Sequence, residues 1–154
     1  MTTYLWLKLI HIVSATVLFG TGLGTAFFML KAYLDGNEDA LRATARNVVI
    51  ADWLFTTPAV VIQLISGIWL TSLLNIAFNS QWFIAVISLY VFVGLCWLPV
   101  VWIQIRVRDL LAAGRSRDSY AGLMRVWIAL GVPAFLSVMV IFYLMVSKSG
   151  ISYA

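Results

Sequence analysis

The chain is poor in charge, cysteine and histidine. Charged residues make up 10% of its 154 positions, whereas soluble domains have roughly 25%. A single cysteine excludes an intramolecular disulfide framework and Cys-rich metal or iron–sulfur sites, and a single histidine excludes multi-histidine zinc or di-iron centres within one protomer. With 63% hydrophobic residues, the composition is that of a membrane protein with a narrow range of available chemistry.

Four long apolar segments lie at 5–34, 48–74, 82–103 and about 123–146. Each reaches the roughly 17–25 residues that a transmembrane helix needs. They predict an all-α fold, a four-helix transmembrane bundle, in a single integral-membrane domain within the lipid bilayer. Between the first two segments, Asp35-Gly36-Asn37-Glu38-Asp39 indicates a helix end and a new start, so we expect a short interfacial helix before the second span.

The cations are concentrated in two connections. The first connection holds Lys31, Arg42 and Arg46, and the third holds five arginines between positions 106 and 125, whereas 75–81 carries no charge. Because short loops rich in Lys and Arg stay cytoplasmic, both termini are predicted to be periplasmic, in a multi-pass protein of the bacterial cytoplasmic (inner) membrane. The basic third connection is interpreted as this topology signal and not as a nucleic-acid site.

Tryptophans support the predicted span ends because they favour the membrane–water interface. Six of the seven fall near such an end, and Trp97 lies deeper. We expect two aromatic belts, an outer one of Trp6, Trp69 and Trp82 and an inner one of Trp53, Trp102 and Trp127.

His11 is the ionisable residue that hydrocarbon should reject most clearly, since such a group near mid-span costs roughly 2.5–3.5 kcal/mol. Helical spacing predicts that it faces the bundle interior, with Lys8 one turn away. Two interpretations stay open. In one, His11 is bonded to a backbone carbonyl or to Ser66, Ser88 or Tyr143; in the other, it ligates haem iron or another metal, with Met139 and Met145 as sources of a second axial ligand. The residues predicted to share its inward face are Ala15, Leu18, Gly22, Thr25 and Met29.

A polar stripe runs along the second span. Asp52, Thr56, Gln63 and Ser66 share one helical face, which is too polar to face lipid. For Asp52 the sequence leaves two interpretations, an acid paired with Arg46 or with an arginine of the third connection, and a proton relay or substrate contact.

Glycines and prolines within the spans indicate where helices approach or bend. Gly20 and Gly24 lie four residues apart, on roughly the opposite face from His11, and permit close approach of another helix, either within the bundle or from a second subunit. The three prolines each remove a helical hydrogen bond and predict kinks at similar depth. These prolines are Pro58, Pro99 and Pro133. Two interpretations stay open, a cavity that opens to the cytoplasm and ordinary packing in which the prolines are tolerated.

Two stretches resemble known membrane families. The opening sequence Tyr4-Leu5-Trp6-Leu7-Lys8-Leu9-Ile10-His11-Ile12, followed by the glycines of 20–24, resembles the first span of the HemJ-type protoporphyrinogen oxidases and the CopD-like copper-resistance membrane proteins. The second span looks more like a related uncharacterised family of small predicted integral-membrane proteins in the same superfamily. The residues that carry this second likeness are Ala51-Asp52-Trp53-Leu54-Phe55-Thr56-Thr57-Pro58, with Gln63 and Ser66-Gly67 beyond.

The resemblance to HemJ-type proteins implies haem b bound through His11, with Lys8 near a propionate or an anionic substrate. Those proteins carry an Arg and a further His toward the inner end of the first span, where this chain has Phe27 or Phe28 and Ala32. The resemblance therefore implies haem ligation more than protoporphyrinogen oxidation.

From these patterns we expect a membrane redox or haem-binding protein. His11 would be the axial ligand, Lys8 would compensate negative charge, and the stripe of Asp52, Thr56, Gln63 and Ser66 would handle protons or a polar substrate. The alternative is a non-enzymatic membrane module, either a partner subunit or a small transporter, including CopD-like metal handling. That module would assemble as a homodimer or with a partner membrane subunit through Gly20 and Gly24.

Overall fold

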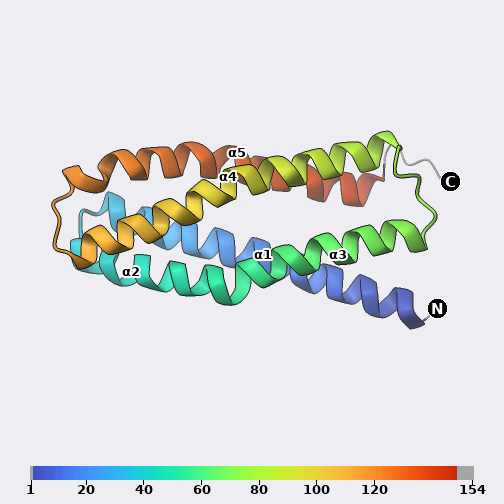
Figure 1. The fold of residues 1–154 in the computed structure, drawn as a ribbon, viewed down its shortest axis with the longest axis horizontal. Helices are drawn as coiled ribbons and strands as arrows, with labels where there is room; N and C mark the ends of the chain where they lie inside the picture. The colour runs from blue at the N-terminus through green and yellow to red at the C-terminus, as the bar shows by residue number, and fades with distance from the viewer. Residues whose placement is uncertain (1, 149–154) are drawn as a thin grey trace.

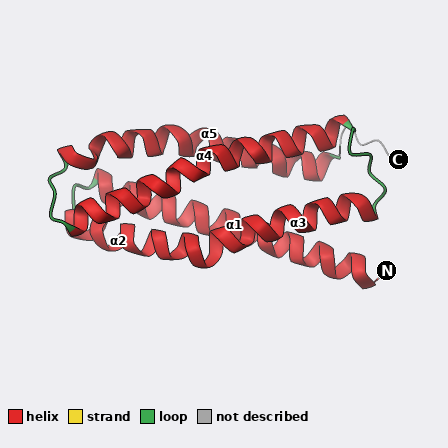
Figure 2. Cartoon of the chain, viewed as in Figure 1, coloured by secondary structure: helices red, strands yellow, loops and turns green. Residues whose placement is uncertain are grey.

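The computed structural model describes residues 2–148, and its regular elements are all helices (Figures 1 and 2). The elements are α1 (Thr2–Leu34), α2 (Glu38–Ala51), the π-helical turn η1 (Asp52–Thr56), α3 (Thr57–Leu73), α4 (Gln81–Ala112) and α5 (Asp118–Ser147). Since α2, η1 and α3 follow one another without a break, the chain forms four long rods that run up and down. The predicted all-α four-helix bundle is confirmed.

All four rods are long and apolar enough to cross a membrane. Their outward faces are apolar as well, with Phe28, Leu95 and Leu98 more than 60% exposed. Such surfaces suit lipid, since a soluble protein rarely exposes large continuous apolar patches. The start of α1 and the end of α5 lie at the same end of the bundle (Figure 1). Their periplasmic placement stays a prediction.

The first connection has the chemistry of a helix stop and restart. Gly36 takes a left-handed φ of +69°, and the Asn37 side chain accepts a hydrogen bond from Ala40 N at 2.9 Å, which caps α2. Glu38 and Asp39 then place negative charge in the first turn. The predicted break is confirmed, but the short interfacial helix is not separate, because α2 continues into the second span.

The π-helical turn lies just before Pro58. Thr57 N donates to Asp52 O, five residues back, so the turn holds one more residue than an α-helical turn. Pro58 has no N–H to give to the preceding turn, which favours this local change in hydrogen bonding. The rod bends at this place (Figure 1), and both Asp52 and Thr56 are buried.

A tightly packed core fills the end of the bundle that carries the basic connections, which we call the basic end. There α2 packs against both α1 and α4, and Met29, Val107 and Met124 have no exposed surface. Arg117 closes this end, since its guanidinium lies 4.7 Å from the centre of the Tyr33 ring and its Nη2 donates to Tyr33 O. The core therefore concentrates where α2 lies between the other helices.

The opposite half of the bundle, which carries both termini, is built as two helix pairs. Here α1 packs against α3 and α4 packs against α5. Tyr90 of α4 joins the pairs by donating its hydroxyl to Val60 O at 2.7 Å, and Phe19 of α1 packs on the rings of Phe135 and Phe142 of α5. Two cavities remain between the pairs, and Phe19 lines both.

Two tryptophans do not lie where the aromatic belts were predicted. Trp82 and Trp127 are buried, and Trp82 Nε1 donates to Leu144 O at 2.8 Å, which fastens α4 to α5. The expectation was wrong for these two because position along a span fixes depth but not the face that a side chain takes. The other four predicted belt residues are exposed, namely Trp6, Trp53, Trp69 and Trp102.

Candidate functional site

His11 lies between α1 and α3, and both of its ring nitrogens have side-chain partners. Nδ1 is 2.8 Å from Ser66 Oγ, and Nε2 is 3.0 Å from Gln63 Nε2. Ser14, one turn along α1, donates its hydroxyl to Gln63 Oε1. We call His11, Ser14, Gln63 and Ser66 the His11 cluster. The prediction that His11 forms a hydrogen bond to Ser66 is confirmed.

The hydrogen bonds of the cluster favour one tautomer of the imidazole. Ser66 Oγ donates its proton to Ile62 O at 2.6 Å, so its oxygen accepts from His11 Nδ1–H. Nε2 therefore carries the lone pair and accepts from the Gln63 amide. In this tautomer the ring is a neutral imidazole, and its Nε2 accepts from one amide N–H.

Gly67 makes room for the imidazole. A Cβ atom at this position would lie 3.2 Å from His11 Cε1 and 3.8 Å from Nδ1. Because glycine has no side chain, the α3 backbone approaches the ring closely, and the bonds to Ser66 and Gln63 become short enough to form.

A cavity of about 710 Å³ adjoins this cluster, and we call it the His11 cavity. Besides His11 and Gln63, it is bordered by Lys8, by Met145 of α5 and by Lys148. Lys8 also lies over the Tyr4 ring, with Nζ 5.7 Å from its centre. One imidazole, one thioether and two ammonium groups thus border one space. Met139, the other methionine considered, does not line this cavity and is 41% exposed.

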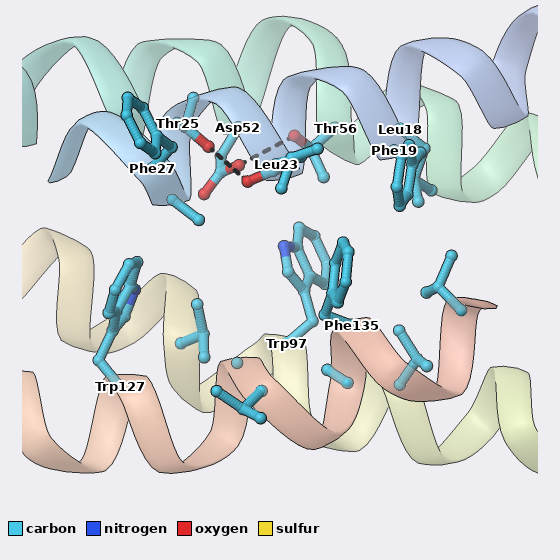
Figure 3. A pocket seen from close by; sticks show the side chains of 18 of the residues that line it. Leu18, Phe19, Leu23, Thr25, Phe27, Asp52, Thr56, Trp97, Trp127 and Phe135 are labelled. Atoms are coloured by element: carbon cyan, nitrogen blue, oxygen red, sulfur yellow. Dashed lines mark hydrogen bonds between the residues drawn. The ribbon is translucent and has the colours of Figure 1, made fainter. Parts of the chain in front are cut away.

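Asp52 and Thr56 line a second cavity of about 430 Å³, which we call the Asp52 cavity. Thr56 Oγ1 donates to Asp52 Oδ1 at 2.9 Å, whereas Asp52 Oδ2 has no hydrogen-bond partner. The predicted pairing with an arginine is wrong, since the ion pairs found within residues 2–148 are Lys31–Asp35 and Arg108–Asp109, and Arg46 is exposed. Figure 3 shows the carboxylate reaching from its helix into the cavity, across from Trp97 and Trp127.

The structure divides the predicted polar stripe between the two cavities. Gln63 and Ser66 join His11, whereas Asp52 and Thr56 belong to the other cavity. Gln63 follows Asp52 by eleven positions, which corresponds to a rise of about 16 Å along the helix axis at 1.5 Å per residue. The four residues share a face, as predicted, but they do not form one site.

Three polar residues of these sites were not assigned to them from the sequence. Ser14 is three residues from His11 on the inward face and could have been found by helical spacing. Gln104 and Trp127 are buried against the Asp52 cavity, on α4 and α5. No pattern within those two segments indicated this, because a glutamine near a span end and an interfacial tryptophan are ordinary there.

Gly20 and Gly24 have open space beside them. A Cβ atom at either glycine would meet no atom of another segment within 4 Å, so neither contacts another helix of the bundle closely. Gly20 also borders the His11 cavity. The proposed contact with a second subunit is compatible with this open face.

Within residues 2–148, no group of three or more His, Cys, Asp or Glu side chains is suited to hold a metal ion. Cys96 is buried and unbridged. Any iron or copper at His11 would therefore depend on a ligand frame other than a cluster of such side chains.

Residues 5–149 match the family described as "Predicted integral membrane protein (DUF2269)". No curated protein and no solved structure matches the chain.

Proposed function

We propose that this chain, which belongs to the DUF2269 family of predicted integral membrane proteins, is a membrane haem protein that holds haem b in the His11 cavity, where His11 would ligate the iron. The observation that supports this proposal is the position of His11, whose ring borders a cavity of about 710 Å³ and whose Nε2 carries the lone pair in the tautomer that the hydrogen bonds favour. This volume lies in the range of roughly 300–1,000 Å³ that is usual for ligand sites. The relationship to HemJ-type and CopD-like proteins, and a place in a bacterial inner membrane, are parts of the same proposal.

The side chains around the cavity fit a haem. A ligating histidine commonly donates its other ring N–H to the protein, as His11 Nδ1 does to Ser66. Met145 brings a thioether to the same cavity, and His/Met pairs are known axial ligands. Lys8 and Lys148 supply positive charge for two propionates.

Gln63 is the residue that has to move. Its amide now holds Nε2, so ligation requires that the hydrogen bond between Gln63 and His11 be given up. Ser66 keeps the ring oriented during this change, because its own bond is to Nδ1. When bound, haem would supply one-electron transfer, and the protein would set its orientation and surroundings.

An absorption spectrum tests this function directly. Protein purified from cells with ample haem should show a Soret band, and His11→Ala should abolish or shift it, whereas Ser88→Ala, on an exposed part of α4, should leave it unchanged. Gln63→Leu should raise haem occupancy because it frees Nε2. A colourless wild-type preparation, or equal spectra for wild type and His11→Ala, would contradict the proposal.

The second candidate function is that of an assembly module, and the open face at Gly20 and Gly24 favours it. Small residues let transmembrane helices approach closely. Gly24→Leu should then reduce the oligomer measured by cross-linking in nanodiscs, whereas Gly94→Leu, at another open glycine on α4, should not. Equal cross-linking in the two variants would remove this candidate. Gly24 is the better probe of the pair because Gly20 also borders the His11 cavity.

A further inference from the structure

The Asp52 cavity gathers buried polar atoms that have no partner. Within residues 2–148, three such side-chain atoms occur, Asp52 Oδ2, Gln104 Oε1 and Trp127 Nε1, and all three residues line this cavity. These residues are only 4%, 4% and 6% exposed, so solvent outside the protein does not reach these atoms. A buried polar atom without a partner costs about 1–3 kcal/mol. Three of them at one cavity indicate that an occupant supplies the missing hydrogen bonds.

The rest of the cavity wall is apolar and aromatic. Leu18, Phe19, Trp97 and Val100 contribute to it, and its volume is about 430 Å³, far more than one water molecule needs. An occupant that fills this space therefore has a hydrocarbon body. Its polar group must meet two acceptors, a carboxylate oxygen and an amide oxygen, beside an indole N–H.

The opening of the cavity faces the lipid. Leu23 and Phe27 of α1, and Val132 and Leu136 of α5, line the cavity and are also exposed by 46–58%. The cavity thus opens sideways between α1 and α5, which do not pack closely along their length. A ligand that dissolves in the bilayer can enter by this route without crossing the packed core at the basic end.

The carboxyl group of Asp52 determines which polar group the occupant should carry. Asp52 is the one ionisable side chain among the residues of the described chain that line this cavity, and it has no cation beside it. Burial disfavours the ionised form of a carboxyl group without a partner, and a cation with N–H donors would stabilise that form and offer a donor to Gln104 Oε1, which lines the same cavity.

We propose that the Asp52 cavity binds a lipophilic amine, whose ammonium group bonds Asp52 and Gln104 and whose hydrocarbon body lies among Phe19, Trp97 and Phe135. A hydroxyl next to the amine would also accept the Trp127 N–H. This site is separate from the His11 cavity, with Phe19 between them, and it does not depend on haem binding.

Quenching of tryptophan fluorescence tests the proposal, because Trp97 and Trp127 line the cavity. The whole protein in zwitterionic nanodiscs is titrated with a brominated dodecylamine and with the matching brominated dodecanol. The amine should quench saturably and bind at least about tenfold more tightly than the alcohol, since a hydrogen bond to a charged group contributes about 1.5–3 kcal/mol.

Variants assign the effect to the proposed residues. Asp52→Asn should weaken amine binding about tenfold or more and remove the preference over the alcohol, and Gln104→Leu should weaken it less. Asp39→Asn, an exposed acid of α2, is the matched control and should bind as wild type does. Thermal unfolding of each variant shows whether it is folded.

Three results would overturn the proposal. Equal binding of amine and alcohol would show that the site does not distinguish an ammonium group from a hydroxyl group. Unchanged amine binding in both Asp52→Asn and Gln104→Leu would show that the amine binds elsewhere. The absence of saturable quenching by either probe would mean that water, and not a lipophilic amine, satisfies the three polar atoms.

Discussion

The two cavities of this bundle are bordered by polar groups in opposite states. In the His11 cluster, α1 and α3 satisfy each other's polar groups, so that both imidazole nitrogens and the Gln63 carbonyl oxygen are hydrogen-bonded. At the Asp52 cavity, three polar atoms from three different helices are buried without a partner. Polar groups at the first site bond one another across the helix pair, whereas those at the second have no partner among residues 2–148.

The difference follows from how the helices pack. The His11 cluster lies within one helix pair, where Gly67 lets the two backbones approach. Asp52, Gln104 and Trp127 belong to η1, α4 and α5 and face one another across the space between pairs. Side chains within a pair reach each other, and those across the cavity do not.

The same substitution in the two sites should have different effects, and the larger effect is expected at Gln63. Gln63→Leu removes its bonds to His11 and Ser14, and interhelical bonds in membranes contribute about 0.6–1.7 kcal/mol each, so we expect a loss of about 1–3 kcal/mol. Unfolding in mixed micelles at increasing denaturing detergent measures it. A variant as stable as wild type would mean that the cluster does not hold α1 to α3.

Enlarging Gly67 tests the close approach within the pair. Gly67→Val places a Cβ atom 3.2 Å from His11 Cε1, and we expect a loss of about 1–2 kcal/mol, since overpacking costs about 1–3 and the ring can shift slightly. Gly94→Val is the control, because a Cβ atom there meets nothing within 4 Å. Similar midpoints for the two variants in the micelle titration would argue against a tight fit at Gly67.

The smallest loss of stability is expected at Gln104. Because Gln104 Oε1 is buried without a partner, which costs about 1–3 kcal/mol, Gln104→Leu should not lower the free energy of unfolding in protein freed of lipophilic ligands and should raise it where the leucine packs well. The comparison with Gln63→Leu is direct, since the two substitutions are chemically identical. A large loss at Gln104 would show that its amide has a structural role, and the contrast between the sites would fail.

Much of the His11 site could be predicted from the sequence. Helical spacing placed His11 toward the interior, and Ser66 was among its expected partners. The spacing of Gln63 put it on the same face of the second span, but its bond to His11 Nε2 depends on the register between α1 and α3. That register is set by packing at Gly67, a position whose importance lies in the absence of a side chain.

The Asp52 site could be predicted only in part. Asp52 and Thr56 were expected to face inward, and both are buried. The arginine partner was a reasonable expectation for an acid near a basic connection, but the bend at η1 turns Asp52 into the cavity instead. Gln104 and Trp127 come from helices whose apolar residues are distributed around the axis, so spacing gives no preferred face.

The sequence by itself determined the number of helices, their approximate ends and their alternation through the membrane, because long apolar segments and capping residues act locally. Only the tertiary structure decided which faces of those helices meet, that the polar stripe serves two cavities, and that Trp82 and Trp127 are buried. The physical reason is that lipid and the protein interior are equally apolar. Hydrophobicity therefore drives a segment into the membrane but does not determine which face of the helix packs against other helices. Small residues, hydrogen bonds and shape make that choice, and they act between segments that are far apart in the chain.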